Sequence, residues 1–358
     1  MFVANKKINE QKMKKIQDAD LENKKVLARV DFNVGISDGK IQEKFKLEAC
    51  QETVDFILSQ EGTKLAVCSH LGRPNGKVNP EFSLSQIRET LEEILGRRVV
   101  FVDDCIGEKV NEAMINLAAN EILLLENVRF YEGEEENEDD FAEKLAANFD
   151  VFVNEAFSVC HRDQASVTGV TKFLPGFAGF WLQKEIENLN NVFSQPAHPA
   201  VAIIGGAKIE TKLPLIQKFE NSYEAVLVGG MIANEAIEQK ISFSEKVFLP
   251  VDFADEQRRD IGEKTIEKFK EIISGAKTVI WNGPLGKFEE SPFDKSTRII
   301  LDAVMESGAF SLIGGGESVQ VLEENGLIGK ISFVSTGGGA MLEYLSGNKM
   351  PGIEALIK

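Results

Sequence analysis

Four short apolar runs in the second half of the chain each end in a cluster of glycines, and a segment with helical spacing follows each one. A short apolar run bounded by glycine predicts a buried strand that enters a tight turn. Strands that alternate with helices predict a mostly parallel sheet, and such sheets bind ligands beyond the carboxyl ends of their strands. The runs with their glycines are Ala200 to Ile204 with Gly205 and Gly206, Ala225 to Val228 with Gly229 and Gly230, Phe310 to Ile313 with Gly314, Gly315 and Gly316, and Phe333 to Val334 with Gly337, Gly338 and Gly339.

The first of these turns also carries two lysines, Lys208 and Lys212, beside a segment of helical spacing at 209–219. A glycine turn lets backbone N–H groups approach an anion, and the start of a helix adds its dipole. Lysines four residues apart share one face of a helix. A single such turn is more often a packing feature, but four of them, one with two lysines, favour a site for a nucleotide or another polyphosphate.

The first half of the chain also alternates strand and helix patterns, with strands predicted at 25–30, 64–69, 99–103, 122–126 and 151–154. Cations and hydrogen-bonding groups, rather than glycine clusters, follow these strands. For any single arginine, pairing with a nearby acid is an equally good explanation. Several at equivalent strand ends favour an anionic substrate, because the guanidinium fork suits carboxylate and phosphate. The residues expected to converge are His70, Arg73, Arg129, His161 and Arg162.

These two halves together predict a phosphoryl transfer, because one half is suited to nucleotide phosphates and the other to a small anion. That chemistry depends on stabilising charge and excluding water more than on an elaborate base. Sites on separate domains would have to close on one another for the transfer.

Composition narrows the class of protein. A chain of 358 residues suggests two domains, and a net charge of −17 argues against nucleic-acid binding. No apolar run is long enough to span a membrane, and residues 1–20 carry no export signal, so we expect a cytoplasmic monomer. The acidic run 132–140 is expected on a solvated surface, with metal binding a weak alternative. Four cysteines without metal-like spacing are expected to be buried thiols: Cys50, Cys68, Cys105 and Cys160.

From Lys24 to the C-terminus the chain resembles the phosphoglycerate kinase family. The resemblance rests on six motifs in the order of that family: Arg29-Val-Asp-Phe-Asn-Val34, Ser69-His-Leu-Gly-Arg-Pro74, Glu126-Asn-Val-Arg-Phe130, Gly205-Gly-Ala-Lys208, Trp281-Asn-Gly-Pro284 and Ser335-Thr-Gly-Gly-Gly339. It implies an α/β protein with two doubly wound, parallel-sheet (Rossmann-like) domains joined by a hinge helix. It also implies a phosphoglycerate-binding domain at 1–178 with a return segment at 342–358, a nucleotide-binding domain at 179–341, and a hinge from Leu174 to Asn190.

The resemblance further implies reversible, ATP-dependent phosphorylation of 3-phosphoglycerate to 1,3-bisphosphoglycerate, with Mg²⁺ as cofactor. It places the phosphoglycerate on Asp31, Asn33, Lys46, His70, Arg73, Arg129 and Arg162. It places the nucleotide on Lys208, Lys212, Asn282, Glu289, Gly315, Gly316, Glu317 and Ser318, with the metal at Glu317. The residues that would act on the transferring group are Lys46, Lys208, Gly316 and Gly339.

This chain departs from the family pattern at several positions. Lys46, or Lys44 if the alignment is shifted, stands where the family has its catalytic arginine, and Glu317 replaces the metal-binding aspartate. Arg258 replaces a glycine of the adenine pocket, and the segment 233–260 is some tens of residues shorter than usual. Thr211 and the motif from Glu155 to Gln164 also differ.

Two functions from different classes remain open on the sequence. A working kinase is favoured by the retained lysines, arginines and glycine turns, whereas a non-catalytic relative that binds an anion for regulation or assembly is favoured by the departures. A dinucleotide dehydrogenase is a poor third, because none of the glycine clusters fits the Gly-x-Gly-x-x-Gly fingerprint.

Overall fold

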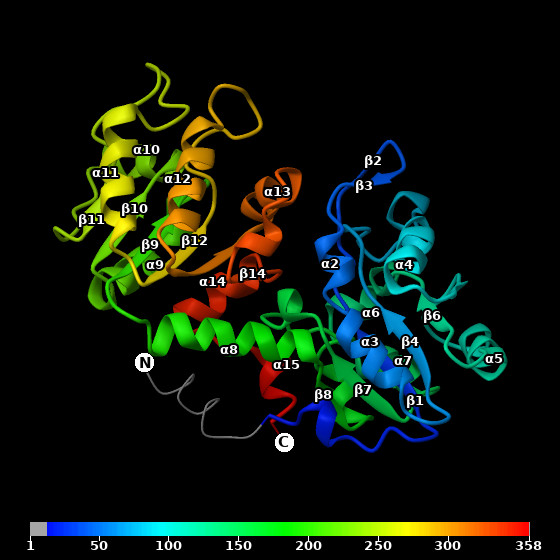
Figure 1. Cartoon of the computed structure of the whole chain (residues 1–358). Coiled ribbons are helices and arrows are strands. Elements are labelled where there is room, and N and C mark those ends of the chain that lie inside the picture. The colour runs from blue at the N-terminus through cyan, green and yellow to red at the C-terminus, as the bar shows by residue number, and fades with distance from the viewer. Residues whose placement is uncertain (1–12, 358) are drawn as a thin grey trace. The chain divides into compact units, whose positions relative to one another are not determined.

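The computed structural model describes residues 13–357 and divides the chain into two compact units (Figure 1). The first unit runs to Glu185 and takes up the chain again from Gly347, and the second is Ile186–Ser346. The sequence placed these boundaries at 178 and 341. Helix α8 (Phe180–Ser194) contains the first boundary, so no break in secondary structure marks it.

The sheet of the first unit has six parallel strands in the order β5-β6-β4-β1-β7-β8. Alternate residues of its strands belong to two different cores: Val26 and Ala28 of β1 pack in one, and Leu27 packs in the other. Both faces are therefore buried, as parallel sheets require. The strands are β1 (Lys25–Arg29), β4 (Lys64–Cys68), β5 (Val99–Val102), β6 (Ile122–Leu125), β7 (Val151–Asn154) and β8 (Gly176–Ala178), with a separate hairpin of β2 (Ile36–Ser37) and β3 (Lys40–Ile41).

The α-helices of the first unit cover this sheet. They are α2 (Phe45–Glu48), α3 (Gln51–Leu58), α4 (Arg88–Leu95), α5 (Glu108–Asn116), α6 (Glu132–Glu135), α7 (Asp139–Ala146), the start of α8, and α15 (Pro351–Glu354). Short 3₁₀ segments in the chain are η1 (Ile16–Asp18), η2 (Pro80–Phe82), η3 (Leu84–Ile87), η4 (Val128–Phe130), η5 (Phe157–Val159), η6 (Gly169–Lys172) and η7 (Ile328–Lys330).

The sheet of the second unit has the order β11-β10-β9-β12-β13-β14, also all parallel. Counted along this unit, the order is 3-2-1-4-5-6, the doubly wound arrangement that binds ligands where the winding reverses. Here the reversal lies between β9 and β12. The strands are β9 (Ala200–Ile204), β10 (Ala225–Val228), β11 (Val247–Phe248), β12 (Thr278–Asn282), β13 (Phe310–Gly314) and β14 (Phe333–Ser335).

Each glycine turn of the second unit joins a strand to a helix, as the sequence predicted. The helices that follow β9, β10, β13 and β14 are α9 (Ile209–Ser222), α10 (Gly230–Glu238), α13 (Gly316–Glu324) and α14 (Gly339–Ser346). Helices α11 (Glu263–Ser274) and α12 (Lys295–Glu306) complete the unit. The prediction of two parallel-sheet α/β domains is therefore confirmed.

The predicted strands end within one residue of the observed ones, but four parts of the fold went unpredicted: β8, β11, β12 and the β2–β3 hairpin. The expected hinge range from Leu174 also contains β8, and α8 begins only at Phe180. The helix starts there because the buried carboxylate of Glu155 accepts the N–H groups of Trp181 at 2.9 Å and Leu182 at 3.3 Å.

The acidic run 132–140 is mostly exposed, but the prediction of a solvated surface is wrong for Glu134, which is fully buried. All four cysteines are buried and unbridged, as predicted. The segment after Gly347 packs within the first unit, where the Gly352 N–H donates to the Cys160 carbonyl at 3.0 Å. Within residues 13–357 no helix combines the length and the apolar character that crossing a membrane requires.

Candidate active site

The predicted anion-binding residues of the first unit follow four strands of its sheet: β1, β4, β6 and β7. Strands β4, β1 and β7 are neighbours, and β6 lies beside β4. Their carboxyl ends therefore share one edge of the sheet, which brings together groups that lie far apart in the sequence.

His70 lies among the cations of this edge. Its side chain is buried, and burial together with the positive charges of Arg29 and Arg129 holds its pKa well below the usual value for histidine. Lys46 and Arg162 add to the same effect. The imidazole is therefore neutral at pH 7, so toward an anion it could act as a hydrogen-bond donor but not as a positive charge.

Asp31, Asn33 and Lys46 form a connected group. Lys46 Nζ donates to the Asn33 carbonyl at 2.9 Å and lies 3.5 Å from the Asp31 carboxylate. Asn33 Oδ1 accepts the Gly72 N–H at 2.9 Å, which ties the loop after β1 to the loop after β4. Lys46 is thus held by the residues with which the sequence grouped it.

Arg129 is almost fully buried, and burial together with the charges of Arg162 and Arg29 lowers its pKa to about 10. Its Nη1 donates to the Gly72 carbonyl at 2.8 Å, and its Nε lies 3.7 Å from the Glu135 carboxylate. Its Nη2 has no partner among residues 13–357. A buried guanidinium nitrogen without a partner is costly, and an anionic ligand would satisfy it.

Arg73 and Arg162 complete the predicted cations. Arg73 is exposed and makes no hydrogen bond or ion pair with the part of the chain that the structure describes. Arg162 Nε donates to His161 Nε2 at 3.3 Å.

Arg29 is a further cation of this edge that the sequence did not predict. A residue within β1 would ordinarily be read as structural. Arg29 is fully buried, and its Nη2 lies 3.1 Å from His70 Nδ1.

A cavity of about 410 Å³ lies at the glycine turns of the second unit. It contains most of the predicted phosphate-binding residues and adds Gly283 and Leu342. Its lining is Gly205, Gly206, Ala207, Lys208, Lys212, Asn282, Gly283, Gly315, Gly316, Glu317, Gly338, Gly339 and Leu342.

Glycine is required where the turns after β9 and β12 meet. The Gly205 N–H donates to the Asn282 carbonyl at 2.9 Å, and a Cβ added to Gly205 would lie 2.1 Å from the Pro284 carbonyl oxygen. No side chain fits such a contact, so the two loops can approach only through glycine. This contact closes the floor of the cavity at the point where the winding reverses.

The two lysines of the cavity differ, and the prediction that they share a helical face is wrong. Lys208 precedes α9 in a left-handed conformation (φ +68°) and is exposed. Lys212 is buried within α9, donates to Asn282 Oδ1, and has a pKa lowered by burial to about 8. Lys208 is therefore the exposed lysine of the cavity, and Lys212 is the one held in place by a neighbouring side chain.

The other predicted nucleotide residues are placed unequally. Asn282 lines the cavity and donates to the Gly314 carbonyl at 3.0 Å. Ser318 Oγ accepts the Gly283 N–H at 3.0 Å, and Ser318 lines neither this cavity nor the next. The start of α9, expected to bind phosphate, has its first N–H, that of Ile209, occupied by the Glu235 carboxylate at 2.7 Å. Sequence reasoning missed Glu235, whose helical position gave no signal.

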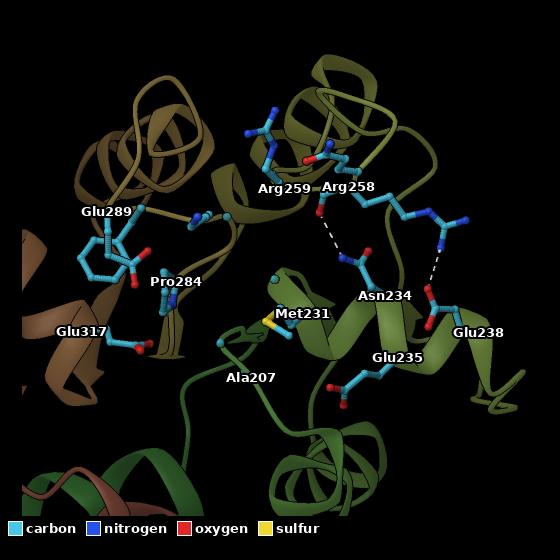
Figure 2. A pocket seen from close by; sticks show the side chains of 16 residues that line it. Ala207, Met231, Asn234, Glu235, Glu238, Arg258, Arg259, Pro284, Glu289 and Glu317 are labelled. Carbon is cyan, nitrogen blue, oxygen red and sulfur yellow. Dashed lines mark hydrogen bonds and ion pairs between the residues drawn. The ribbon is translucent and has the colours of Figure 1, made fainter.

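Figure 2 shows a second cavity, of about 620 Å³. It shares Gly206, Ala207 and Glu317 with the first. Glu289, predicted to reach the ribose, lines it. Arg258 occupies its rim with φ +56°, a conformation that favours glycine. The Arg258 guanidinium lies 3.9 Å from Glu238 and 5.2 Å from the ring centroid of Phe253.

Glu317 is the carboxylate best placed for a metal that travels with a polyphosphate. It lines both cavities in the first turn of α13, and burial and Glu289 raise its pKa while Lys212 opposes that rise. Mg²⁺ commonly uses one or two protein carboxylates and completes its shell with phosphate oxygens and water. A single carboxylate beside a cavity lined by glycine turns and two lysines fits that pattern.

Comparisons with known proteins point to one family. A family model described as "Phosphoglycerate kinase" matches residues 16–243 and 236–348. The phosphoglycerate kinase of Borrelia hermsii is 38% identical, and the alignment covers 97% of this chain and 100% of that protein. The phosphoglycerate kinase of Wolbachia sp. subsp. Drosophila simulans is also 38% identical, and the alignment covers 96% of this chain and 98% of that protein. The crystal structure of phosphoglycerate kinase from Pyrococcus horikoshii superposes with a TM-score of 0.86 at 30% identity, covering 96% of this chain and 98% of that one.

These matches also locate where the chain is shorter. The alignment with the Borrelia protein extends over 391 positions, more than the 358 residues available here, so that relative carries residues that this chain lacks. The family model matches in two pieces that meet at 236–243, inside the segment expected to be abbreviated. There the chain passes from α10 through the two-residue strand β11 to α11.

Proposed function

Because this chain belongs to the phosphoglycerate kinase family, we propose that its first unit binds 3-phosphoglycerate and its second unit binds the nucleotide. The chain is an enzyme that transfers a phosphoryl group reversibly between ATP and 3-phosphoglycerate, giving ADP and 1,3-bisphosphoglycerate. The comparisons favour this reaction over the non-catalytic alternative.

One observation carries the assignment of the sites. In each unit, residues from several strand ends gather at one place, and the two places differ in chemistry: cations around a neutral histidine in the first unit, and glycine amides with two lysines in the second. The first suits a small phosphate-bearing carboxylate, and the second suits a polyphosphate.

On the phosphoglycerate side, the proposed ligands are Asp31, Asn33, Lys46, His70, Arg73, Arg129 and Arg162. Arg129 offers its unpartnered Nη2, and Arg73 offers a guanidinium without an internal partner among the described residues. Lys46 supplies positive charge to the substrate carboxylate or to the transferring group. It lacks the two-pronged geometry of arginine, so its contact fixes orientation less well.

On the nucleotide side, we propose that Lys212 and the amides of Gly315 and Gly316 hold phosphates, with Asn282 fixing Lys212. Glu289 is proposed to reach the ribose. Glu317 is the proposed ligand of Mg²⁺, which, when bound, neutralises phosphate charge. The exposed Lys208 and the amide of Gly339 are proposed to stabilise the phosphoryl group during transfer.

The proposed chemistry needs no general base. The nucleophile is a carboxylate, which is already ionised at neutral pH, and it attacks the terminal phosphorus while the oxygen that bridges to ADP departs. The residues of this chain therefore act by orienting the reactants and by compensating charge, which is the usual basis of phosphoryl transfer.

A coupled assay for ATP-dependent consumption of 3-phosphoglycerate tests the reaction, and calorimetric titrations test the sites. Lys46→Met should weaken 3-phosphoglycerate binding about 30-fold and leave ADP binding within twofold, since one charge-assisted contact is lost. Lys212→Met should do the reverse. If either variant weakens both ligands equally, the assignment of the two sites is wrong.

A further inference from the structure

A buried relay leads to one ligand of the phosphoglycerate site proposed above, His70, through residues that are not themselves proposed ligands. It consists of Glu134, Ser166, Arg29 and His70, and Glu134, Ser166 and Arg29 are each fully buried. Arg29 Nε donates to Ser166 Oγ at 2.9 Å, and Ser166 donates to Glu134 through Oγ at 2.7 Å and through its N–H at 2.8 Å.

Chemistry fixes the direction of every bond in this relay. A guanidinium can only donate, so Ser166 Oγ must accept from Arg29 and pass its own hydrogen to Glu134. The same argument applies at the other end, where Arg29 Nη2 lies 3.1 Å from His70 Nδ1. Nδ1 must therefore be the acceptor, which leaves the proton of a neutral imidazole on Nε2.

We propose that Arg29, held by Ser166 and Glu134, is a positioning residue that fixes His70 as the Nε2–H tautomer. Nε2 has no protein partner among residues 13–357, so this hydrogen is available to an anionic substrate. With the opposite tautomer, Nε2 would present a lone pair to that anion and repel it. The proposal rests on the proposed function for the identity of the anion, but not for the tautomer.

The relay also explains why so much charge is buried. Arg29 and Glu134 lie on opposite sides of one hydroxyl, so each buried charge is compensated through Ser166. A buried ion pair is weak evidence for stability, because burial costs about as much as the attraction returns. The role of the Arg29–Ser166–Glu134 arrangement here is to orient the His70 imidazole at the edge of the substrate site.

The decisive measurement is the tautomer of His70 in the intact protein. The chain has only three histidines, so selective ¹⁵N labelling and long-range ¹H–¹⁵N correlation give a spectrum that His161→Gln and His198→Gln variants assign. We expect a protonated Nε2 and an unprotonated Nδ1 at pH 7, without any ligand. A protonated Nδ1, in either the other tautomer or the imidazolium, would overturn the proposal.

Ser166→Ala tests whether the relay controls that tautomer. We expect His70 to populate both tautomers and the KM for 3-phosphoglycerate to rise about tenfold, with kcat changed less than threefold. Ser166→Thr keeps the hydroxyl and should restore both properties. An unchanged tautomer in Ser166→Ala would show that the relay does not position His70.

Ser296→Ala is the matched control. Ser296 also presents its N–H and Oγ to a buried carboxylate, that of Asp260, but it lies in the second unit. It should lose similar stability and leave the His70 spectrum unchanged; a change of tautomer there would count against the relay as the cause. Because the spectrum needs no turnover, an inactive protein with the expected tautomer would contradict the proposed function alone.

Discussion

The two proposed substrate sites are built from different materials. In the first unit, charged side chains are oriented by other buried side chains, as Arg29 orients His70. In the second unit, backbone turns form the cavity, and the side chains in it are few: Lys208 stands exposed, and Lys212 is held by Asn282. A site made of side chains is tuned through their partners, whereas a site made of backbone is tuned by the conformations that its glycines allow.

The two sites also differ in how far the effect of a single substitution spreads. Replacing one member of the first site leaves other buried polar groups unsatisfied, so effects spread through the network. In the second site, the exposed Lys208 has no such side-chain network among the described residues, so we expect its removal to affect the reaction and not the rest of the site. Substitutions should therefore separate binding from turnover more cleanly in the second unit than in the first.

The largest effect is expected from Lys208→Ala. If Lys208 stabilises the phosphoryl group only during transfer, kcat should fall by about a thousandfold while KM for either substrate changes less than threefold. Steady-state kinetics measures both quantities.

Lys240→Ala is the control for backbone effects in this variant. Lys240 is also exposed and left-handed, with φ +53°, but it lines neither cavity. It should change kcat less than twofold. If Lys208→Ala instead raises KM as much as it lowers kcat, Lys208 acts in ground-state binding, and the contrast between the units fails.

The parallel sheets and the gathering of residues at their edges could be predicted because both follow from local patterns. Apolar runs such as 200–204 have the length and glycine boundary of buried strands, and the strand ends of a parallel sheet coincide by geometry. Two-residue strands such as β11 have too little pattern to recognise, and β8 lies in the range read as a hinge.

The parts of the site that escaped prediction depend on tertiary burial. Glu134 lies among acidic neighbours, so composition predicts solvent, yet Ser166 and Arg29 meet it in the interior. Likewise, the spacing of Lys208 and Lys212 indicates a shared helical face, whereas the turn before α9 rotates Lys208 out of the helix. Contacts between distant segments decide the first case, and the left-handed backbone conformation of Lys208 decides the second.

A smaller effect is expected from pH. Lys212 is charged below its pKa of about 8, so raising the pH from 7 to 9 should neutralise it and weaken ADP binding about tenfold. The 3-phosphoglycerate affinity should change less than twofold, because burial holds the pKa of His70 below this range and Arg129 titrates near 10. Calorimetric titrations at several pH values would measure both.

Lys212→Met is the control for the pH experiment, since it should bind ADP weakly at every pH. If the variant keeps the pH dependence of the wild type, another group is responsible. Equal pH dependence of the two ligands would remove the distinction between a nucleotide site with a titrating lysine and a phosphoglycerate site without one.

The smallest effect concerns Arg258, a residue of the second unit whose backbone conformation is strained. Arg258→Gly should stabilise the fold by up to about 1 kcal/mol, because a left-handed non-glycine residue is strained. The exposed ion pair with Glu238 that is lost contributes little to stability. Adenosine should bind the wild type weakly and this variant about threefold more tightly, since the side chain lines the rim of the second cavity.

Arg258→Ala separates the two contributions, because it removes the same side chain but keeps the unfavourable φ. It should match Arg258→Gly in adenosine affinity and fall below it in stability, as measured by calorimetric titration and urea unfolding. Equal stabilities would show that φ +56° costs nothing at this position. Strong binding of adenosine to the wild type would show that base contacts, rather than phosphate contacts, dominate the nucleotide site. The contrast between a site tuned by side chains and one tuned by backbone would then have to be abandoned.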